Sequence, residues 1–191
     1  MTPPPPGDGG PSLPPRPIVL IGMMGSGKTE VGRVLAERLG CGFADLDRQI
    51  EAAAGRSVAT IFAEEGEAGF RRRESAAVTE IAAAVRAGTG PGVIAGGGGV
   101  VLDPTNAETL RRAGTVVWLQ VTPAVAASRL GGPEGRPILE ALPGDLEGSI
   151  ATLIAERAGA YRAAAHHAVD ASGPPDEVAA AVLAVLDVPA P

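Results

Sequence analysis

The sequence contains little cysteine and few aromatic residues. Cys41 is the single cysteine among 191 residues, which excludes an internal disulfide bond and is consistent with a reducing compartment. Because Cys41 stands beside an apolar run, we expect it to be a small buried hydrophobic residue. Aromatic residues make up 3% of the chain, so its core must be built mainly from Ala, Val, Leu and Ile. The length predicts one domain with a complete core.

Positive charge and long apolar runs are also scarce. The formal net charge is −6, and a nucleic-acid-binding surface would need a basic patch, so we expect no nucleic-acid partner. No apolar run approaches the roughly 18 residues that span a bilayer, so we expect no membrane association. Residues 1–16 are rich in Pro and Gly and do not resemble a signal peptide, and we interpret them as a disordered tail. These features predict a cytoplasmic protein with its folded domain at 17–188.

Apolar runs of strand length alternate with segments of helical periodicity, which is typical of an α/β fold with a parallel sheet. The expected arrangement is a single domain of three layers, α/β/α, around a five-stranded parallel sheet. Residues 116–119 are continuously apolar, as in a strand that is buried on both faces. The predicted strands are 18–21, 42–46, 92–95, 115–121 and 168–171. Helices are predicted after the glycine-rich loop at 22–29, where the helix would end at Gly40, and at 66–87, 105–113, 123–130, 145–165 and 175–187.

Residues 22–29 read G-M-M-G-S-G-K-T and fit the G-x-x-x-x-G-K-[ST] pattern of a phosphate-binding loop. An apolar strand precedes this stretch and an amphipathic helix follows it, which is the context that such a loop needs. Lys28 would supply a charge for the β- and γ-phosphates, and the Thr29 hydroxyl would bind Mg²⁺. A plain glycine turn is the alternative. The four fixed positions and both flanks nevertheless predict that the chain binds a nucleoside triphosphate.

Two carboxylates, Asp45 and Asp47, stand at the end of the second predicted strand. Alternation along an extended strand would place both on the same side, at the edge of the sheet where α/β proteins bind ligands. One carboxylate could hold Mg²⁺, and the other could accept the proton of a substrate hydroxyl. The alternative is that they cap a helix that begins near Arg48. The later strands are not followed by a further aspartate, which favours Asp45 as the metal ligand.

The segment 66–74 contains an arginine between two glutamates. Glu67 and Arg71 are four residues apart, and Arg71 and Glu74 are three apart, so the three side chains share one face of a helix. They could form a surface ion-pair ladder of little energetic value. A guanidinium held between two carboxylates could equally be a rigid fork for an anionic substrate. The spacing leaves both interpretations open.

Four glycines at 96–99 follow the third predicted strand. They favour either the close approach of a ligand to the backbone or a sharp bend. Arg157 and Tyr161 lie one helical turn apart, and Arg157 could reach a carboxylate or merely contact solvent. A glycine-rich loop at 131–137 is flanked by Arg129 and contains Arg136. Such a loop could close over a nucleotide as a mobile lid at about 130–140, or it could be a plain solvated loop.

Taken together, these residues resemble the shikimate kinases, a family of the nucleoside-monophosphate-kinase-like phosphate-loop group. The agreement runs from about Ile18 to about Tyr161. Only the phosphate loop is specific by itself, but the order and spacing of all the pieces are specific together. The matching pieces are 22–29, 43–47 with Ile50, Glu51 and Gly55, 61–62, 66–67, 70–71 with Glu74, 93–95, 97–99, Asn106, 136–139, Arg157 and Tyr161.

The resemblance implies that Mg²⁺ and ATP are used to phosphorylate the 3-hydroxyl of shikimate, giving shikimate 3-phosphate and ADP for the synthesis of chorismate and aromatic amino acids. It also implies roles by position. The catalytic residues would be Lys28, Asp47 and Arg136. The nucleotide would be bound by Gly25, Ser26, Gly27, Lys28, Thr29, Glu30, Arg129 and Arg136, with Arg129 against adenine. Shikimate would be bound by Asp47, Arg71, Gly98 and Arg157, and Mg²⁺ by Thr29 and Asp45.

The chain departs from the family pattern at three places. Ala107 and Gly159 stand where the family usually has arginine and proline, and residues 171–175 lack an arginine that many members place near adenine. Two rival functions remain: another small-molecule kinase of this fold, such as a gluconate kinase, and a nucleotide-binding module without turnover. The substrate-side residues argue against the first, and the complete set of charged residues argues against the second. A monomer is favoured over an oligomer.

Overall fold

The computed structural model describes residues 16–188, so the predicted tail at 1–16 lies outside the described residues except for Arg16. Five strands form one parallel sheet in the order β2-β3-β1-β4-β5. The strands are β1 (Ile18–Ile21), β2 (Phe43–Asp45), β3 (Val93–Ala95), β4 (Thr115–Gln120) and β5 (His167–Asp170). Each lies within a residue of its predicted bounds, and the predicted five-stranded parallel sheet is confirmed.

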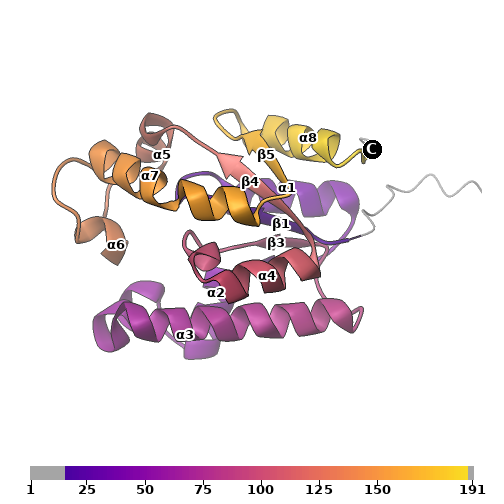
Figure 1. Ribbon diagram of the computed structural model, residues 1–191, viewed down its shortest axis with the longest axis horizontal. Helices are drawn as coiled ribbons and strands as arrows, with labels where there is room; N and C mark the ends of the chain where they lie inside the picture. Colours follow the sequence, from indigo (N-terminus) through magenta and orange to yellow (C-terminus); the bar gives the residue numbers. More distant parts are fainter. Residues whose placement is uncertain (1–15, 189–191) are drawn as a thin grey trace, which may run out of the picture.

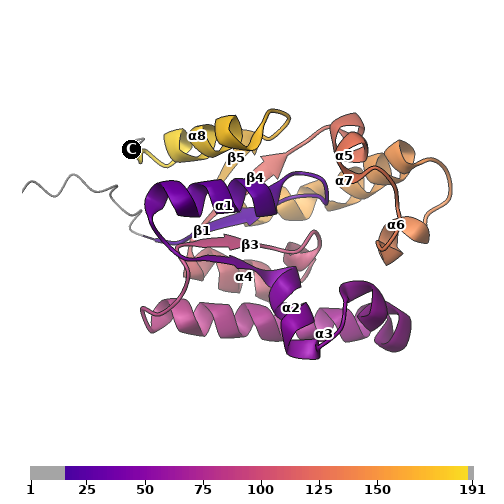
Figure 2. The ribbon, with the colours of Figure 1, turned by 180° about the vertical axis from the view of Figure 1, so that it is seen from behind.

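Helices cover both faces of the sheet (Figures 1 and 2). They are α1 (Lys28–Leu39), α2 (Leu46–Ala54), α3 (Val58–Arg86), α4 (Pro104–Ala113), α5 (Pro123–Leu130), α6 (Pro137–Glu140), α7 (Leu146–Ala164) and α8 (Pro175–Val185), with a short 3₁₀ helix, η1 (Val100–Leu102), before α4. α1 and α8 pack on one face, and α3, α4 and α7 pack on the other. The fold is therefore the predicted three-layer α/β/α arrangement.

The central strand β1 shows why the sequence forms three layers. All four of its residues are fully buried. Ile18 and Leu20 belong to the core beneath α1 and α8, whereas Val19 and Ile21 belong to the core beneath α3 and α4. Successive side chains of a strand point to opposite faces, so a continuously apolar strand needs a helical layer on each side.

Two helices differ from their predicted bounds by more than one residue, α2 was predicted only as an alternative, and α6 was not predicted. The helix predicted at 66–87 begins eight residues earlier, at Val58, and bends at Gly66. The helix predicted at 175–187 ends at Val185. α6 was missed because four residues are too few to show a helical period. Pro123 and Pro175 stand in the first turns of α5 and α8, as expected of proline at helix starts.

The prediction that Asp45 and Asp47 share one side of an extended strand is wrong. The strand ends at Asp45, which is the N-cap of α2 and accepts a hydrogen bond from the backbone N–H of Arg48 at 3.3 Å. Asp47 lies in the first turn of α2. The physical reason is local: an Asp side chain that caps its own backbone favours the start of a helix over the continuation of a strand.

The sheet order places the loops with functional residues at one edge. β1 is central, with β3 on one side and β4 on the other. In such sheets, ligands bind beyond the carboxyl ends of the strands, where the strand order reverses. The loop at 22–27 follows β1, Asp45 ends β2, and the glycines at 96–99 follow β3. The fold thus brings three separately predicted features to the same edge.

Candidate active site

The loop between β1 and α1 has the geometry that its glycines predict. Gly25 has a φ of 80°, which side-chain-bearing residues rarely adopt, and a Cβ there would lie 2.8 Å from the carbonyl oxygen of Ala126. Gly27 is the N-cap of α1 and has no side chain to cover the first N–H groups of that helix. These N–H groups and the positive end of the helix dipole are therefore available to an anion.

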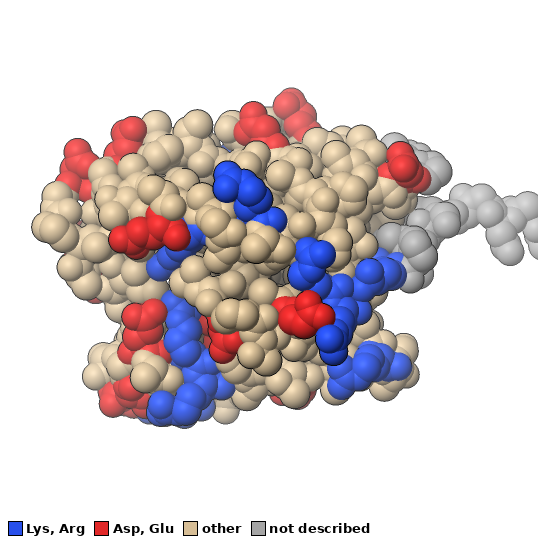
Figure 3. Space-filling model, in the orientation of Figure 1, with Lys and Arg blue, Asp and Glu red and all other residues tan. Residues whose placement is uncertain are grey.

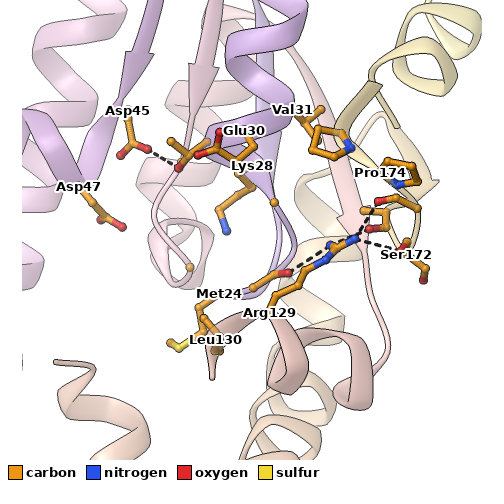
Figure 4. Close-up of a pocket in the computed structure, with 18 of the residues that line it drawn as sticks. Met24, Lys28, Glu30, Val31, Asp45, Asp47, Arg129, Leu130, Ser172 and Pro174 are labelled. Atoms are coloured by element: carbon orange, nitrogen blue, oxygen red, sulfur yellow. Dashed lines mark hydrogen bonds between the residues drawn. The ribbon is translucent and has the colours of Figure 1, made fainter. Parts of the chain in front are cut away.

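Lys28 is held at the centre of this loop. Its Nζ donates hydrogen bonds to the carbonyl oxygens of Gly22 and Met23, both at 2.9 Å. Burial lowers the pKa of Lys28 to about 8, while the nearby carboxylates of Asp47 and Asp45 oppose that shift. In Figure 4 the lysine lies between these two aspartates and the opposite wall of the cavity. Its position is therefore fixed by backbone carbonyls before any phosphate arrives.

Asp45 and Thr29 form an oxygen pair beside Lys28. The Thr29 hydroxyl donates a 2.6 Å hydrogen bond to Asp45 Oδ2 (Figure 4). Asp45 also caps α2, so the metal-ligand and helix-cap interpretations both apply to it. A hydroxyl and a carboxylate at this distance are the oxygen donors that Mg²⁺ prefers, together with water and phosphate oxygens. These two residues fit a magnesium site.

Asp47 and Glu74 are two carboxylates with raised pKa values. Burial raises the pKa of Asp47 above its usual value, and the positive charge of Lys28 opposes the shift. Burial also raises the pKa of Glu74, and Arg71 opposes that shift. A Cβ on Gly97 would lie 2.7 Å from Glu74 Oε1 and 2.9 Å from Asp47 Oδ1. The glycine run thus lets the backbone pass between the two carboxylates.

Arg71 is held by the glutamates that its spacing predicted. Its Nη1 donates to Glu74 Oε2 at 2.8 Å, and its Nη2 donates to Glu67 Oε1 at 3.0 Å. Glu74 is 1% exposed, so this is no surface ladder. Within residues 16–188, Oε1 of Glu74 has no hydrogen-bond partner. The arrangement favours the interpretation of Arg71 as a rigid fork.

Arg157 and Tyr161 both reach the glycine run from α7. Arg157 Nη1 donates to the carbonyl oxygen of Gly98 at 3.1 Å, and the Tyr161 hydroxyl donates to the same oxygen. Arg157 is 5% exposed and Tyr161 is 1% exposed, so the solvent-facing alternative for Arg157 is wrong. The ring of Tyr161 also packs against Trp118, with 5.6 Å between ring centroids. Gly98 is therefore fixed by two donors from one helix.

Two adjoining cavities divide the predicted residues between them. The larger, about 710 Å³, is lined by 25 and 27–30, together with Arg129. The smaller, about 280 Å³, is lined by Arg71, Glu74 and Arg157. Four residues line both cavities: Met24, Asp47, Gly98 and Arg136. Most residues predicted for a nucleotide thus line the larger cavity, most predicted for an acceptor line the smaller one, and the two cavities meet at the four shared residues.

Comparison with known proteins decides the family. A family model described as shikimate kinase matches residues 24–187. The chain belongs to the shikimate kinase family. The shikimate kinase of Symbiobacterium thermophilum is 52% identical over 151 residues, which are 78% of this chain and 83% of that protein. Shikimate kinase 2 of Sodalis glossinidius is 41% identical over 172 residues, 88% of this chain and 94% of that protein.

Solved structures agree with this family membership. The shikimate kinase of Acinetobacter baumannii, solved in complex with shikimate, superposes with a TM-score of 0.83 at 33% identity and covers 91% of this chain and 94% of its own. A gluconokinase of Sinorhizobium meliloti 1021 gives a TM-score of 0.57 at 22% identity, which shows a shared fold alone. The expectation that the chain is a kinase, with ATP and a small-molecule substrate, is confirmed.

The two arginines predicted to meet the nucleotide are bound to backbone carbonyls. Arg129 Nη1 donates to Ala171 at 2.8 Å and to Gly25 at 3.3 Å, and its Nη2 donates to Ser172 at 3.0 Å (Figure 4). Arg136, the N-cap of α6, donates to carbonyl oxygens of its own loop. In this shikimate kinase, Arg129 thus joins the phosphate loop to the segment after β5.

Some site residues were not predicted, and one predicted residue is not exposed to the site. Ser26 is fully buried and lines neither cavity. The apolar walls of the smaller cavity were not predicted, because aliphatic and aromatic residues show no pattern distinct from core residues. These walls are formed by Met24, Val58, Phe62, Phe70, Pro137 and Ile138. Glu51 also lines this cavity and accepts a hydrogen bond from the backbone N–H of Val58 at 3.0 Å.

No helix within residues 16–188 combines the length and the apolar character that crossing a bilayer requires.

Proposed function

We propose that this shikimate kinase transfers the γ-phosphoryl group of ATP to the 3-hydroxyl of shikimate, giving shikimate 3-phosphate and ADP. The observation that supports the proposal best is the pair of cavities that meet at Asp47, Gly98 and Arg136. One cavity begins at a phosphate-binding loop, and the other is lined by the half-buried Arg71 and the buried Arg157, two arginines suited to a carboxylate. The meeting point is where a phosphoryl group and an acceptor hydroxyl would face each other.

The smaller cavity has the donors and acceptors that a hydroxylated carboxylic acid needs. Arg71 and Arg157 supply two guanidinium groups for one carboxylate, and both are already oriented by protein oxygens. Asp47 supplies a hydrogen-bond acceptor for hydroxyl groups, and the backbone at Gly98 approaches the ring of the acceptor without side-chain hindrance. The cavity thus matches a small polyhydroxylated acid in its charge and hydrogen bonding.

The larger cavity has the groups that bind and neutralise phosphates. Lys28 and Arg136 both line this cavity and supply positive charge, and Arg136 also lines the smaller cavity. Thr29 and Asp45 would hold Mg²⁺, which, when bound, neutralises phosphate charge and orients the phosphoryl oxygens. Glu30 lines the same cavity but is exposed and paired with Arg33 at 2.8 Å. Catalysis in such a site depends mainly on positioning and charge neutralisation.

Asp47 is the group placed to take the proton of the attacking hydroxyl. It lines both cavities, so its carboxylate stands between acceptor and phosphates. Burial raises the pKa of Asp47, and a carboxylate with a raised pKa is the stronger proton acceptor. In the transfer, the hydroxyl oxygen forms a bond to phosphorus, the bond to the leaving ADP oxygen breaks, and Asp47 receives the hydroxyl proton.

The proposal is tested by a substrate panel with the purified full chain. ADP release is measured with ATP and shikimate, gluconate or quinate, with and without Mg²⁺. Turnover with shikimate alone is expected, and turnover with gluconate instead of shikimate would overturn the proposal. Lys28→Met is the matched negative control, because methionine has a similar length and no charge. We expect it to lower turnover roughly 10²- to 10³-fold, the effect of losing one transition-state donor, with an unchanged circular dichroism spectrum.

The predictions of a cytoplasmic monomer, of a separate folded domain at 17–188 and of a lid at 130–140 stay predictions. Arg136 of this loop lines both cavities and Gly135 lines the smaller one, which supports a closing role for the loop.

A further inference from the structure

Helix α3 is bent at Gly66, near the smaller cavity, which we call the acceptor cavity. Gly66 has φ 67° and ψ −179°, a backbone conformation that interrupts the helix and favours glycine. The bend divides α3 into a first segment, 58–65, and a second segment, 67–86. Figure 1 shows the first segment folded over one end of the longer second segment. The two segments therefore have independent directions, and something must fix the angle between them.

Four charged residues, none of which lines the smaller cavity, connect the two segments, and we call them the charge cluster: Arg56, Glu64, Glu65 and Arg73. Arg56, in the turn before α3, pairs with both glutamates. Arg73, in the second segment, donates to Glu65 from Nε at 3.1 Å and from Nη2 at 2.8 Å. Figure 3 shows basic and acidic side chains gathered over this end of α3. Both arginines thus share the carboxylate of Glu65.

The contact between Glu65 and Arg73 depends on the bend. Residues eight apart in a straight helix are separated by about 12 Å along its axis. The Glu65 side chain lies over Gly69, where an added Cβ would collide with Glu65 Cβ and lie 3.0 Å from Glu65 Oε2. Glu65 therefore fits against the second segment only because Gly69 has no side chain. The cluster and the bend are parts of one arrangement.

The bend matters for the site because its two segments form walls of the same cavity. Val58 and Phe62 come from the first segment, and Phe70 and Arg71 come from the second. The rings of Phe62 and Phe70 are 4.8 Å apart between centroids and connect the segments on the cavity side. A change in the angle would move Arg71 relative to Val58 and Phe62, and would leave the phosphate loop in place.

We propose that the charge cluster positions Arg71 for the acceptor. The cluster fixes the angle at Gly66 and thereby sets Arg71 against the apolar wall of the acceptor cavity. Isolated surface ion pairs contribute little to stability, so the role of the cluster is to select one geometry. Glu65 is suited to this role because its side chain is largely covered, with 23% exposed, and is bound by two arginines. The inference rests on the proposed function, since it assigns a role toward the acceptor of that reaction.

The first test is Arg73→Met, which removes the charge and the donors but keeps the length. We expect the KM for shikimate to rise roughly fivefold, equivalent to about 1 kcal/mol of acceptor binding, with the KM for ATP unchanged. Arg73→Lys, which keeps a donor for Glu65, is expected to recover most of the effect. Arg112→Met is the matched control, because Arg112 forms an exposed pair with Glu108 at 2.7 Å on α4. It should change neither KM.

A second variant, Gly69→Ala, displaces Glu65 without removing any charge. It should raise the KM for shikimate as Arg73→Met does, although alanine favours helix over glycine. An unchanged KM for shikimate in Arg73→Met, or equal rises for shikimate and ATP in either variant, would overturn the inference. The proposed function is tested separately by the wild type: if the wild type does not phosphorylate shikimate, that function fails, whereas an unaffected Arg73→Met variant refutes only the role of the cluster.

Discussion

At the scale of single residues, the cations of this site are already bound to oxygen atoms of the protein. Lys28 donates to two backbone carbonyls, Arg71 lies between two carboxylates, and Arg157 donates to the carbonyl of Gly98. Charges that are fixed in advance need no reorganisation when the reaction occurs. The fold itself therefore sets the positions of the phosphate-binding and carboxylate-binding groups.

The role of Arg71 is tested by Arg71→Lys. Lysine keeps a positive charge beside the buried Glu74, so the carboxylate is not left unpaired, but it loses the planar set of donors. We expect the KM for shikimate to rise about tenfold, the equivalent of one charge-assisted hydrogen bond of about 1.5 kcal/mol, and the KM for ATP to stay the same. Steady-state kinetics with each substrate varied in turn would measure both constants.

The adjacent arginine provides the control for this prediction. Arg72 is exposed, and Arg72→Lys should change neither KM. Equal increases in the two KM values of Arg71→Lys would show that Arg71 does not bind the acceptor.

At the scale of elements, the strands and most helices could be predicted because their signals are local. Buried strands are continuous apolar runs, and the phosphate loop is marked by its own fixed residues. The start of α3 could not be predicted in the same way, because Gly66 reads equally well as the beginning of a helix or as a bend inside one. Asp45 was ambiguous for a similar reason, since a carboxylate at a strand end can cap a helix and bind Thr29 at once.

Helix α7 contains an interior glycine that offers a test of stability. Gly159 has, among the described residues, no atom within 4 Å of an added Cβ. Glycine in a helix interior is less favourable than alanine by roughly 0.5–1 kcal/mol, because it loses more backbone entropy on folding. Gly159→Ala should therefore increase the free energy of unfolding by about that amount, measured by urea denaturation.

Gly32 is the matched control in another helix interior. A Cβ on Gly32 of α1 would lie 2.5 Å from a ring carbon of Phe43, so Gly32→Ala should destabilise the protein despite the same gain in helix propensity. If both variants were stabilised alike, the contact between the added Cβ and Phe43 would not destabilise the protein, and this prediction would be wrong.

At the scale of the whole molecule, the site depends on contacts between distant parts of the chain. Arg129 joins Gly25 of the phosphate loop to Ala171 and Ser172, which follow the last strand. The sequence showed that residues 171–175 lack an arginine, but not that Arg129 binds their backbone, because that contact requires the final placement of the end of α5 beside the segment that follows β5. Spacing along the chain could not predict contacts of this kind. It could predict which residues stand at the end of each strand.

The end of the sheet opposite the active site contains a histidine, His166, whose protonation is linked to folding. His166 Nδ1 accepts a hydrogen bond from the backbone N–H of Val116 at 2.9 Å, so this nitrogen must be unprotonated. Burial lowers the pKa of His166 below its usual value of 6.5, and the positive charges of Arg111 and Arg16 lower it further. Figure 3 shows basic side chains gathered where α3 and α4 end.

This linkage predicts how the stability of the protein depends on pH. Well above pH 6.5 the histidine is neutral in both the folded and the unfolded chain, so its contribution to stability is complete. As the pH falls through 6.5, the unfolded chain takes up a proton that the folded protein resists, and the free energy of unfolding decreases.

His166→Asn keeps a hydrogen-bond acceptor near the Nδ1 position and cannot titrate, so the variant should lose less stability than the wild type between pH 7.5 and pH 5.5, where the histidine titrates. Urea denaturation across this range would measure the difference. Identical pH dependence in His166→Asn and the wild type would mean that the hydrogen bond from Val116 is not linked to protonation.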